Sequence, residues 1–139
     1  MRSRVAAVGL GLALIVVSVL SWRQNESCQR EEQGLLLGRS LYNVDLMVRL
    51  LGGQNGSEDP KMKELMEMNL QFAVRDAVDA IGHGAELGPH GAVTFIDSVA
   101  KAGQYAATHQ MTSAPQGDTL SKPLGENLAD LEAWLAKRK

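Results

Sequence analysis

The chain is poor in aromatic residues and carries little net charge. Its 139 residues include two Tyr, two Phe and two Trp, and its formal net charge is −2. Three of the 14 basic residues precede position 24, so that 11 basic residues face 16 acidic ones in the remainder. Nucleic-acid binding needs a basic surface and usually aromatic side chains for base stacking, and the sequence provides neither. We therefore expect no nucleic-acid partner.

The motifs that mark common enzyme classes are absent as well. The sequence contains no HExxH, no GxSxG, no GxxxxGK[ST] and no pair of cysteines that would bind a metal or a haem. We therefore expect no catalytic residues and no cofactor. An enzyme would have to assemble its active site from residues whose spacing gives no signal.

Cys28 is the only cysteine, so that it cannot form a disulfide within the chain. In an oxidising compartment, a leftover cysteine suggests either an intermolecular bridge or a free thiol. Cys28 follows shortly after an apolar segment, where it would suit a disulfide between two parallel membrane anchors. The alternative interpretation is an incidental thiol.

That apolar segment spans residues 5–22, which are 18 residues without a charge. A helix of this length is about 27 Å long, close to the roughly 30 Å of a bilayer's hydrocarbon core. We expect residues 1–23 to form a single-pass transmembrane signal-anchor helix that contacts lipid through residues 5–22. Arg2 and Arg4 precede the segment and favour a cytoplasmic N-terminus, while Trp22 and Arg23 would lie at the opposite membrane interface.

A cleavable signal peptide is the competing interpretation of the same residues, because it also combines a basic start with an apolar run. An apolar run longer than the usual 7 to 15 residues favours the uncleaved anchor. Both interpretations place the exported domain, residues 24–139, outside the cytoplasm. In a bacterium this domain would be periplasmic, either held at the cell membrane or released after cleavage.

The exported domain has the periodicity of α-helices. Apolar residues recur at alternating spacings of three and four, and clusters of Gly, Pro and polar residues separate the periodic segments. We expect an all-α fold in which the transmembrane helix precedes a small antiparallel four-helix bundle with up-down-up-down topology. Two helical hairpins that bury their apolar faces against other subunits are the alternative. The expected helices cover about residues 25–51, 60–82, 89–109 and 122–137.

Each expected helix has a predicted apolar seam that should face the core. The seams consist of Leu37, Leu41, Val44, Val48 and Leu51, widened by Leu36, Met47 and Leu50; of Met66, Leu70, Ala73, Ala77 and Ile81; of Val93, Ile96, Ala100, Gly103 and Ala107; and of Leu124, Leu128, Leu131 and Leu135.

The C-terminus of an up-down-up-down bundle returns to the end where its first helix began. Lys137, Arg138 and Lys139 would then approach the lipid surface, where basic residues interact with anionic headgroups. The alternative is that these cations complement the dipole of the last helix.

The decapeptide GHGAELGPHG, residues 82–91, contains the residues best suited to bind a metal. His83, Glu86 and His90 could provide three ligands for zinc, copper or nickel. A turn is the alternative, because glycine ends helices in a left-handed cap and proline suits the first position of the next helix.

These observations favour a membrane-anchored extracytoplasmic helical module for interaction, sensing or adaptor function. Its partners would be membrane lipid and a second protein or another copy of itself. An exported bundle that binds a small ligand or a metal ion is the alternative function.

Overall fold

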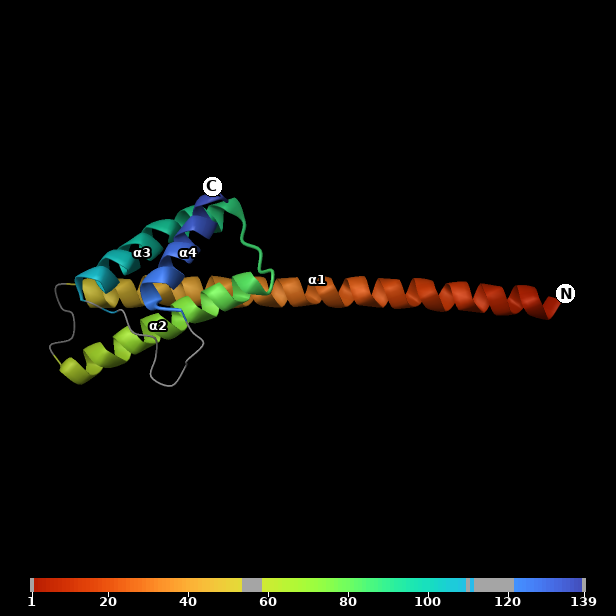
Figure 1. Ribbon diagram of the computed structural model, residues 1–139, viewed down its shortest axis with the longest axis horizontal. Coiled ribbons are helices and arrows are strands. Elements are labelled where there is room, and N and C mark those ends of the chain that lie inside the picture. The colour runs from red at the N-terminus through yellow and green to blue at the C-terminus, as the bar shows by residue number, and fades with distance from the viewer. Residues whose placement is uncertain (1, 54–58, 110, 112–121, 139) are drawn as a thin grey trace.

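The computed structural model describes residues 2–53, 59–109, 111 and 122–138, with side chains from Leu14 onward. These residues form four helices and no strand (Figure 1). The helices are α1 (Arg2–Gly52), α2 (Pro60–Gly82), α3 (Pro89–Thr108) and α4 (Leu124–Ala136). The all-α bundle predicted from the sequence is therefore confirmed.

The first helix, α1, is one uninterrupted helix of 51 residues. It has no break near residue 23, where the sequence suggested the boundary between an anchor and the first bundle helix. The second half of α1 packs in the bundle, and the first half projects far beyond the other helices (Figure 1). Every residue from 14 to 32 is exposed.

The side chains that the structure describes begin at Leu14 in α1. Within them, no helix has a stretch that is both long and apolar enough to cross a membrane. Residues 5–13 of the expected anchor, together with Arg2 and Arg4, have side chains outside this described part.

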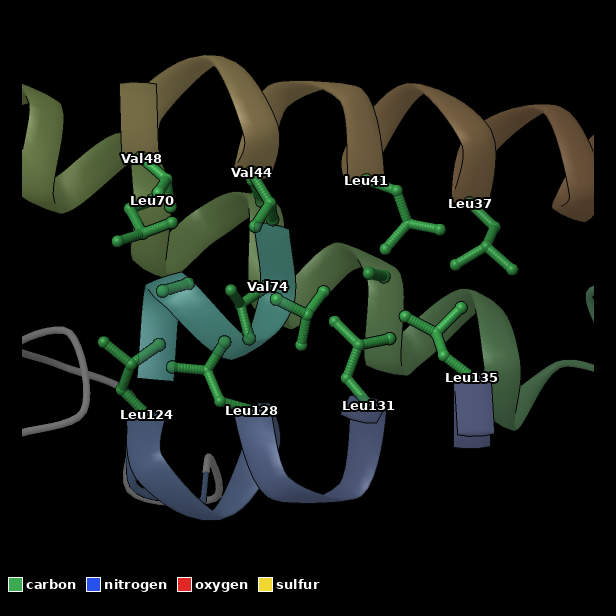
Figure 2. Close-up of a cluster of buried hydrophobic side chains, with 14 of the residues drawn as sticks. Leu37, Leu41, Val44, Val48, Leu70, Val74, Leu124, Leu128, Leu131 and Leu135 are labelled. Atoms are coloured by element: carbon green, nitrogen blue, oxygen red, sulfur yellow. The ribbon is translucent and has the colours of Figure 1, made fainter. Parts of the chain in front are cut away.

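The core lies between the second half of α1 and the three shorter helices. Figure 2 shows leucine and valine side chains from α1, α2 and α4 pointing into this shared interior. Four of the residues predicted for the seam of α1 are buried, and so are all four predicted for α4. They are Leu37, Leu41, Val44 and Val48 in α1 and Leu124, Leu128, Leu131 and Leu135 in α4.

The predicted seam of α3 is wrong by one residue. Val93, which was expected in the core, is 56% exposed. The buried apolar side chains of α3 are instead Ala92, Val99, Ala102 and Ala106, and Ser98 is buried as well. A shift of one residue turns a helix face by about 100°. Alanines lie on both faces of this segment, so that its periodicity alone could not separate the two registers.

The helices alternate in direction as expected, but they are not all antiparallel to their neighbours (Figure 1). In the described residues, α1 packs against α2 and α3, and α4 packs against the same two helices. Asp45 of α1 meets Ser98 of α3, and the C-terminal end of α1 lies beside the C-terminal end of α3. The neighbours α1 and α3 are therefore parallel, which corrects the fully antiparallel arrangement expected from the sequence.

The successive helices α2 and α3 consequently occupy diagonal corners of the bundle. Neighbouring helix axes lie about 8–10 Å apart, so that a diagonal is about 11–14 Å. The connection over residues 83–88 has six residues, and an extended chain of that length reaches about 20 Å. The segment can therefore cross the end of the bundle, and it does so next to Gly34 of α1. A Cβ atom at Gly34 would lie only 3.2 Å from the carbonyl oxygen of Glu86.

Replacement of Gly34 by Ala tests this close approach, with Gly38→Ala as the matched control in the same helix. A Cβ atom at Gly38 meets nothing within 4 Å. Gly38→Ala should therefore raise the free energy of unfolding by about 0.5–1 kcal/mol through helix propensity. Gly34→Ala should raise the free energy of unfolding by much less, because the segment over residues 83–88 must move away from the added Cβ atom. Urea unfolding followed by circular dichroism measures both changes, and equal gains would show that the segment does not pack on Gly34.

Candidate functional site

The decapeptide at residues 82–91 ends α2 and starts α3. The backbone N–H of His83 donates to the carbonyl oxygen of Asp79 at 3.0 Å, and the N–H of Ala85 donates to that of Ala80 at 3.0 Å. Gly84 has a φ of +84°, in the left-handed region that favours glycine. Ala85 is buried, which completes the usual cap of a helix C-terminus. Pro89 is then the first residue of α3.

The predicted metal ligands His83, Glu86 and His90 are not brought together. The ring Nδ1 of His83 lies 2.8 Å from the carbonyl oxygen of Asp79, so that the ring packs along its own helix. The Glu86 carboxylate faces Arg30 of α1 at 3.9 Å. Among the described residues, no group of three or more His, Cys, Asp or Glu side chains could hold a metal ion. The segment forms a turn between α2 and α3.

A groove of about 510 Å³ lies between the C-terminal ends of α1 and α3. The side chains of Arg49, Lys101, Tyr105 and His109 line it. No sequence motif marks this groove, because its residues come from two helices that are more than 45 positions apart in the chain. It exists because α1 and α3 are parallel and end at the same side of the bundle.

Both cations of this groove have carboxylate partners. The Nε atom of Arg49 lies 2.9 Å from Asp45, and the Nζ atom of Lys101 lies 2.6 Å from Asp97. Asp45 also accepts a hydrogen bond of 2.5 Å from the hydroxyl of Ser98. This bond from Ser98 is the main cause that lowers the pKa of Asp45; burial opposes it, and Arg49 assists it. The hydrogen bond from Ser98 to Asp45 links the two parallel helices, whereas each ion pair lies within one helix.

Tyr105 is held on both sides. Its hydroxyl donates to Glu67 of α2 at 2.8 Å, which links two helices at diagonal corners of the bundle. Burial, followed by the hydrogen bond to Glu67, raises the pKa of Tyr105. The ring of His109 stacks on the ring of Tyr105 with centroids 4.0 Å apart. Two contacts therefore hold the Tyr105 side chain in the wall of the groove.

Ser98 and Asp45 form a hydrogen-bonded pair between α3 and α1. A hydroxyl nucleophile needs a neighbouring base that takes its proton, and that base is usually oriented by a third group. Ser98 instead donates directly to a carboxylate whose lowered pKa makes it a poor base. Ser98 and Asp45 therefore do not form a catalytic pair of this kind.

Exposed apolar side chains gather on the outward sides of α1 and α2. Sequence reasoning assigned Leu36 and Leu50 to the core, but both are exposed. They belong to a larger set of large apolar residues that the bundle leaves uncovered: Leu35, Leu36, Tyr42, Leu46 and Leu50 in α1, and Met62, Leu65, Met68 and Phe72 in α2. Such surfaces often contact other proteins.

The residues predicted at the membrane interface are distributed over both ends of the chain. Trp22 and Arg23 are exposed in the projecting part of α1, as is Cys28.

The helix α4 ends at the side of the bundle from which α1 projects (Figure 1). The guanidinium of Arg138 lies 3.5 Å from the ring centre of Trp134, and it also reaches the carbonyl oxygen of that residue. This contact fits the helix-dipole interpretation; Lys137 is exposed, and Lys139 lies outside the described residues.

Comparison with known proteins adds no constraint on function. No protein-family model, no curated protein and no solved structure matches the chain.

Replacement of Ser98 by Ala tests the contact between α1 and α3. The loss of a hydrogen bond to a charged group should lower the free energy of unfolding by about 1–2 kcal/mol at pH 7. Thr94→Ala is the matched control, because Thr94 is exposed in the same helix and its hydroxyl bonds only to the carbonyl oxygen of His90. This control should change the free energy of unfolding by less than about 0.5 kcal/mol.

The penalty of Ser98→Ala should also depend on pH. The pKa of Asp45 is lowered in the folded state, so that its stabilisation is complete above the ordinary value of 3.8 and is lost as the pH falls through the lowered value. Urea titrations between pH 7 and pH 2.5 should therefore show a penalty that shrinks below about pH 4. A penalty that stays constant over this range would mean that Ser98 does not stabilise the ionised carboxylate.

Proposed function

We propose that this chain is a non-catalytic interaction module that the N-terminal part of α1 anchors in a membrane. The N-terminus would lie in the cytoplasm, and the bundle would be displayed on the outer side, which is the periplasm if the organism is a bacterium. The anchor contacts lipid through residues 5–22, and the bundle contacts a protein partner or another copy of the chain.

The observation that carries this proposal is the continuity of α1. Its backbone is helical from Arg2 to Gly52 without interruption. The apolar segment and the helix that contributes Leu37, Leu41 and Val44 to the core are therefore one rod. A rod of this kind holds a bundle at a fixed distance from its anchor and transmits rotation or displacement between the two.

Further support comes from the charges and side chains along this rod. Residues 5–22 contain no charge, whereas Arg2, Arg4 and Arg23 flank them. This order favours a cytoplasmic N-terminus. Trp22 suits the boundary between lipid and water. The apolar residues exposed on α1 and α2 supply the surface that an interaction module needs.

The groove between α1 and α3 favours a second candidate function. Its volume of about 510 Å³ is that of a site for a small molecule. With a cleaved signal peptide, the chain would be an exported binding protein for a small polar ligand. Among the described residues that line the groove, Arg49 and Lys101 are each paired with a carboxylate, which makes this the weaker candidate.

Charged substitutions in the apolar segment test the anchor. Ile15→Asp combined with Val16→Asp should raise the cost of insertion by about 6 kcal/mol, because each carboxylate near the centre of a span costs about 3 kcal/mol. The unmodified chain should stay in the membrane pellet after an alkaline carbonate wash, and the double variant should move to the supernatant.

Leu35→Asp combined with Leu36→Asp is the matched control, because it places the same charges on exposed leucines of the same helix outside the segment. This control should remain in the pellet. Release of the unmodified chain by the wash would contradict the anchor. Intact mass spectrometry separates the two candidate functions, since an N-terminus at Trp22 would show that the segment is a cleaved signal peptide.

A further inference from the structure

A second groove, of about 400 Å³, lies between α1 and α2. We call it the α1–α2 groove, to distinguish it from the groove between α1 and α3. Its volume lies in the range that is typical of sites for small molecules. The two helices pack directly on each other, and each forms one wall of the groove. Its polar lining includes Arg39, Ser40 and Asn43 from α1 and Asp76, Asp79 and His83 from α2.

Ser40 is the buried polar residue of the α1–α2 groove, with 8% of its surface exposed. The other buried polar side chains of the described residues have partners: Ser98 donates to Asp45, and Asn127 donates to the carbonyl oxygen of Lys122. The Ser40 hydroxyl has no partner among these residues. None of their side-chain oxygens or nitrogens is both fully enclosed and unpaired, so that this hydroxyl opens to the groove. Buried hydroxyls normally have a partner, and a molecule in the groove would supply one.

The charged side chains of the α1–α2 groove are unpaired as well. Within the part of the chain that the structure describes, Arg39, Asp76 and Asp79 form no ion pair and no side-chain hydrogen bond. Arg39 belongs to the α1 wall, and the two aspartates belong to the α2 wall. Opposite charges therefore line the same hollow without meeting, which leaves room for a molecule that contacts both walls.

The charges of the α1–α2 groove indicate the class of this molecule. Asp76 and Asp79 are three residues apart on α2, where helix geometry places their Cβ atoms about 5–6 Å from each other. They offer two anionic positions, and Arg39 offers one cationic position. The ring Nδ1 of His83 lies 2.8 Å from the carbonyl oxygen of Asp79. That oxygen can only accept, so that a neutral ring has its Nε2 atom as a further acceptor. A matching ligand has two cationic groups and one carboxylate.

We propose that the α1–α2 groove binds a free amino acid with a cationic side chain, such as lysine or arginine. The carboxylate of the ligand pairs with Arg39. Its two cationic groups pair with Asp76 and Asp79, and one of their N–H groups donates to the Ser40 hydroxyl. A single basic side chain of a partner protein carries one charge, and a diamine has no carboxylate, so that neither matches all three positions. The site does not depend on the anchoring of α1.

Isothermal titration calorimetry of the full-length chain in mild detergent tests the proposal. L-lysine and L-arginine should bind with a dissociation constant below about 1 mM. Norleucine lacks the side-chain ammonium of lysine, and cadaverine lacks its carboxylate, so that each should bind at least about tenfold more weakly. No binding of either basic amino acid would overturn the proposal. Equal binding of lysine and cadaverine, or of lysine and norleucine, would overturn it as well.

Asp76→Asn tests whether lysine binds in this groove, because it removes one anionic position and keeps the size of the side chain. The affinity for lysine should fall at least about fivefold. Glu64→Gln is the matched control, since Glu64 is an exposed carboxylate of the same helix outside the groove. It should change the affinity less than about twofold, because exposed charges at a distance are largely screened. Equal affinities of the two variants would place the ligand elsewhere and overturn the site.

Ser40→Ala separates a role in binding from a role in the fold. Without ligand, the urea midpoint should stay the same or rise slightly, because the hydroxyl has no partner among the described residues and Ala is a better helix former. The affinity for lysine should fall about threefold or more. Ser27→Ala is the control, because its exposed hydroxyl bonds to the carbonyl oxygen of Gln24 in the same helix. This control should leave the affinity unchanged, and an unchanged affinity of Ser40→Ala would overturn the site.

Discussion

The structure depends on the apolar seam of α1. Leu37, Leu41, Val44 and Val48 are buried along one side of this helix, and each contributes about 1.5–3 kcal/mol by its removal from water. The helices α2 and α3 pack directly on α1, and α4 closes the bundle between those two. Because one uninterrupted helix carries both the seam and the projecting segment, the orientation of the bundle determines the orientation of the projecting segment.

The parallel packing of α1 and α3 determines where the polar features lie. The two helices end at the same side of the bundle, which opens the groove beside Tyr105 and His109. The same packing brings Ser98 against Asp45, and the tyrosine hydroxyl reaches Glu67 of the diagonal helix. At the opposite side of the bundle, the segment that joins α2 to α3 crosses next to Gly34. His83 caps the C-terminal end of α2, and His90 lies in the first turn of α3.

Local signals in the sequence predicted much of the fold. Asp59 caps α2 by accepting a hydrogen bond from the N–H of Lys61, and Pro60 follows as the first helical residue. The leucine seam of α4 had only one plausible register, and it is buried. The predicted register of α3 was wrong because alanines on both faces of the helix gave two similar apolar seams. The neighbour order, and contacts such as that between Ser98 and Asp45, 53 positions apart, depend on packing that no short pattern encodes.

The central claim is that α1 is one rigid helix from its projecting segment into the bundle, and a distance measurement across residue 23 tests it most directly. Spin labels at Ser21→Cys and Asn43→Cys, in a Cys28→Ser background and diluted with unlabelled chain, are separated by 22 residues. A continuous helix predicts a narrow distance distribution near 33 Å, at about 1.5 Å per residue. A broad distribution, or one centred at a much shorter distance, would show a break between the segment and the bundle and would contradict the account.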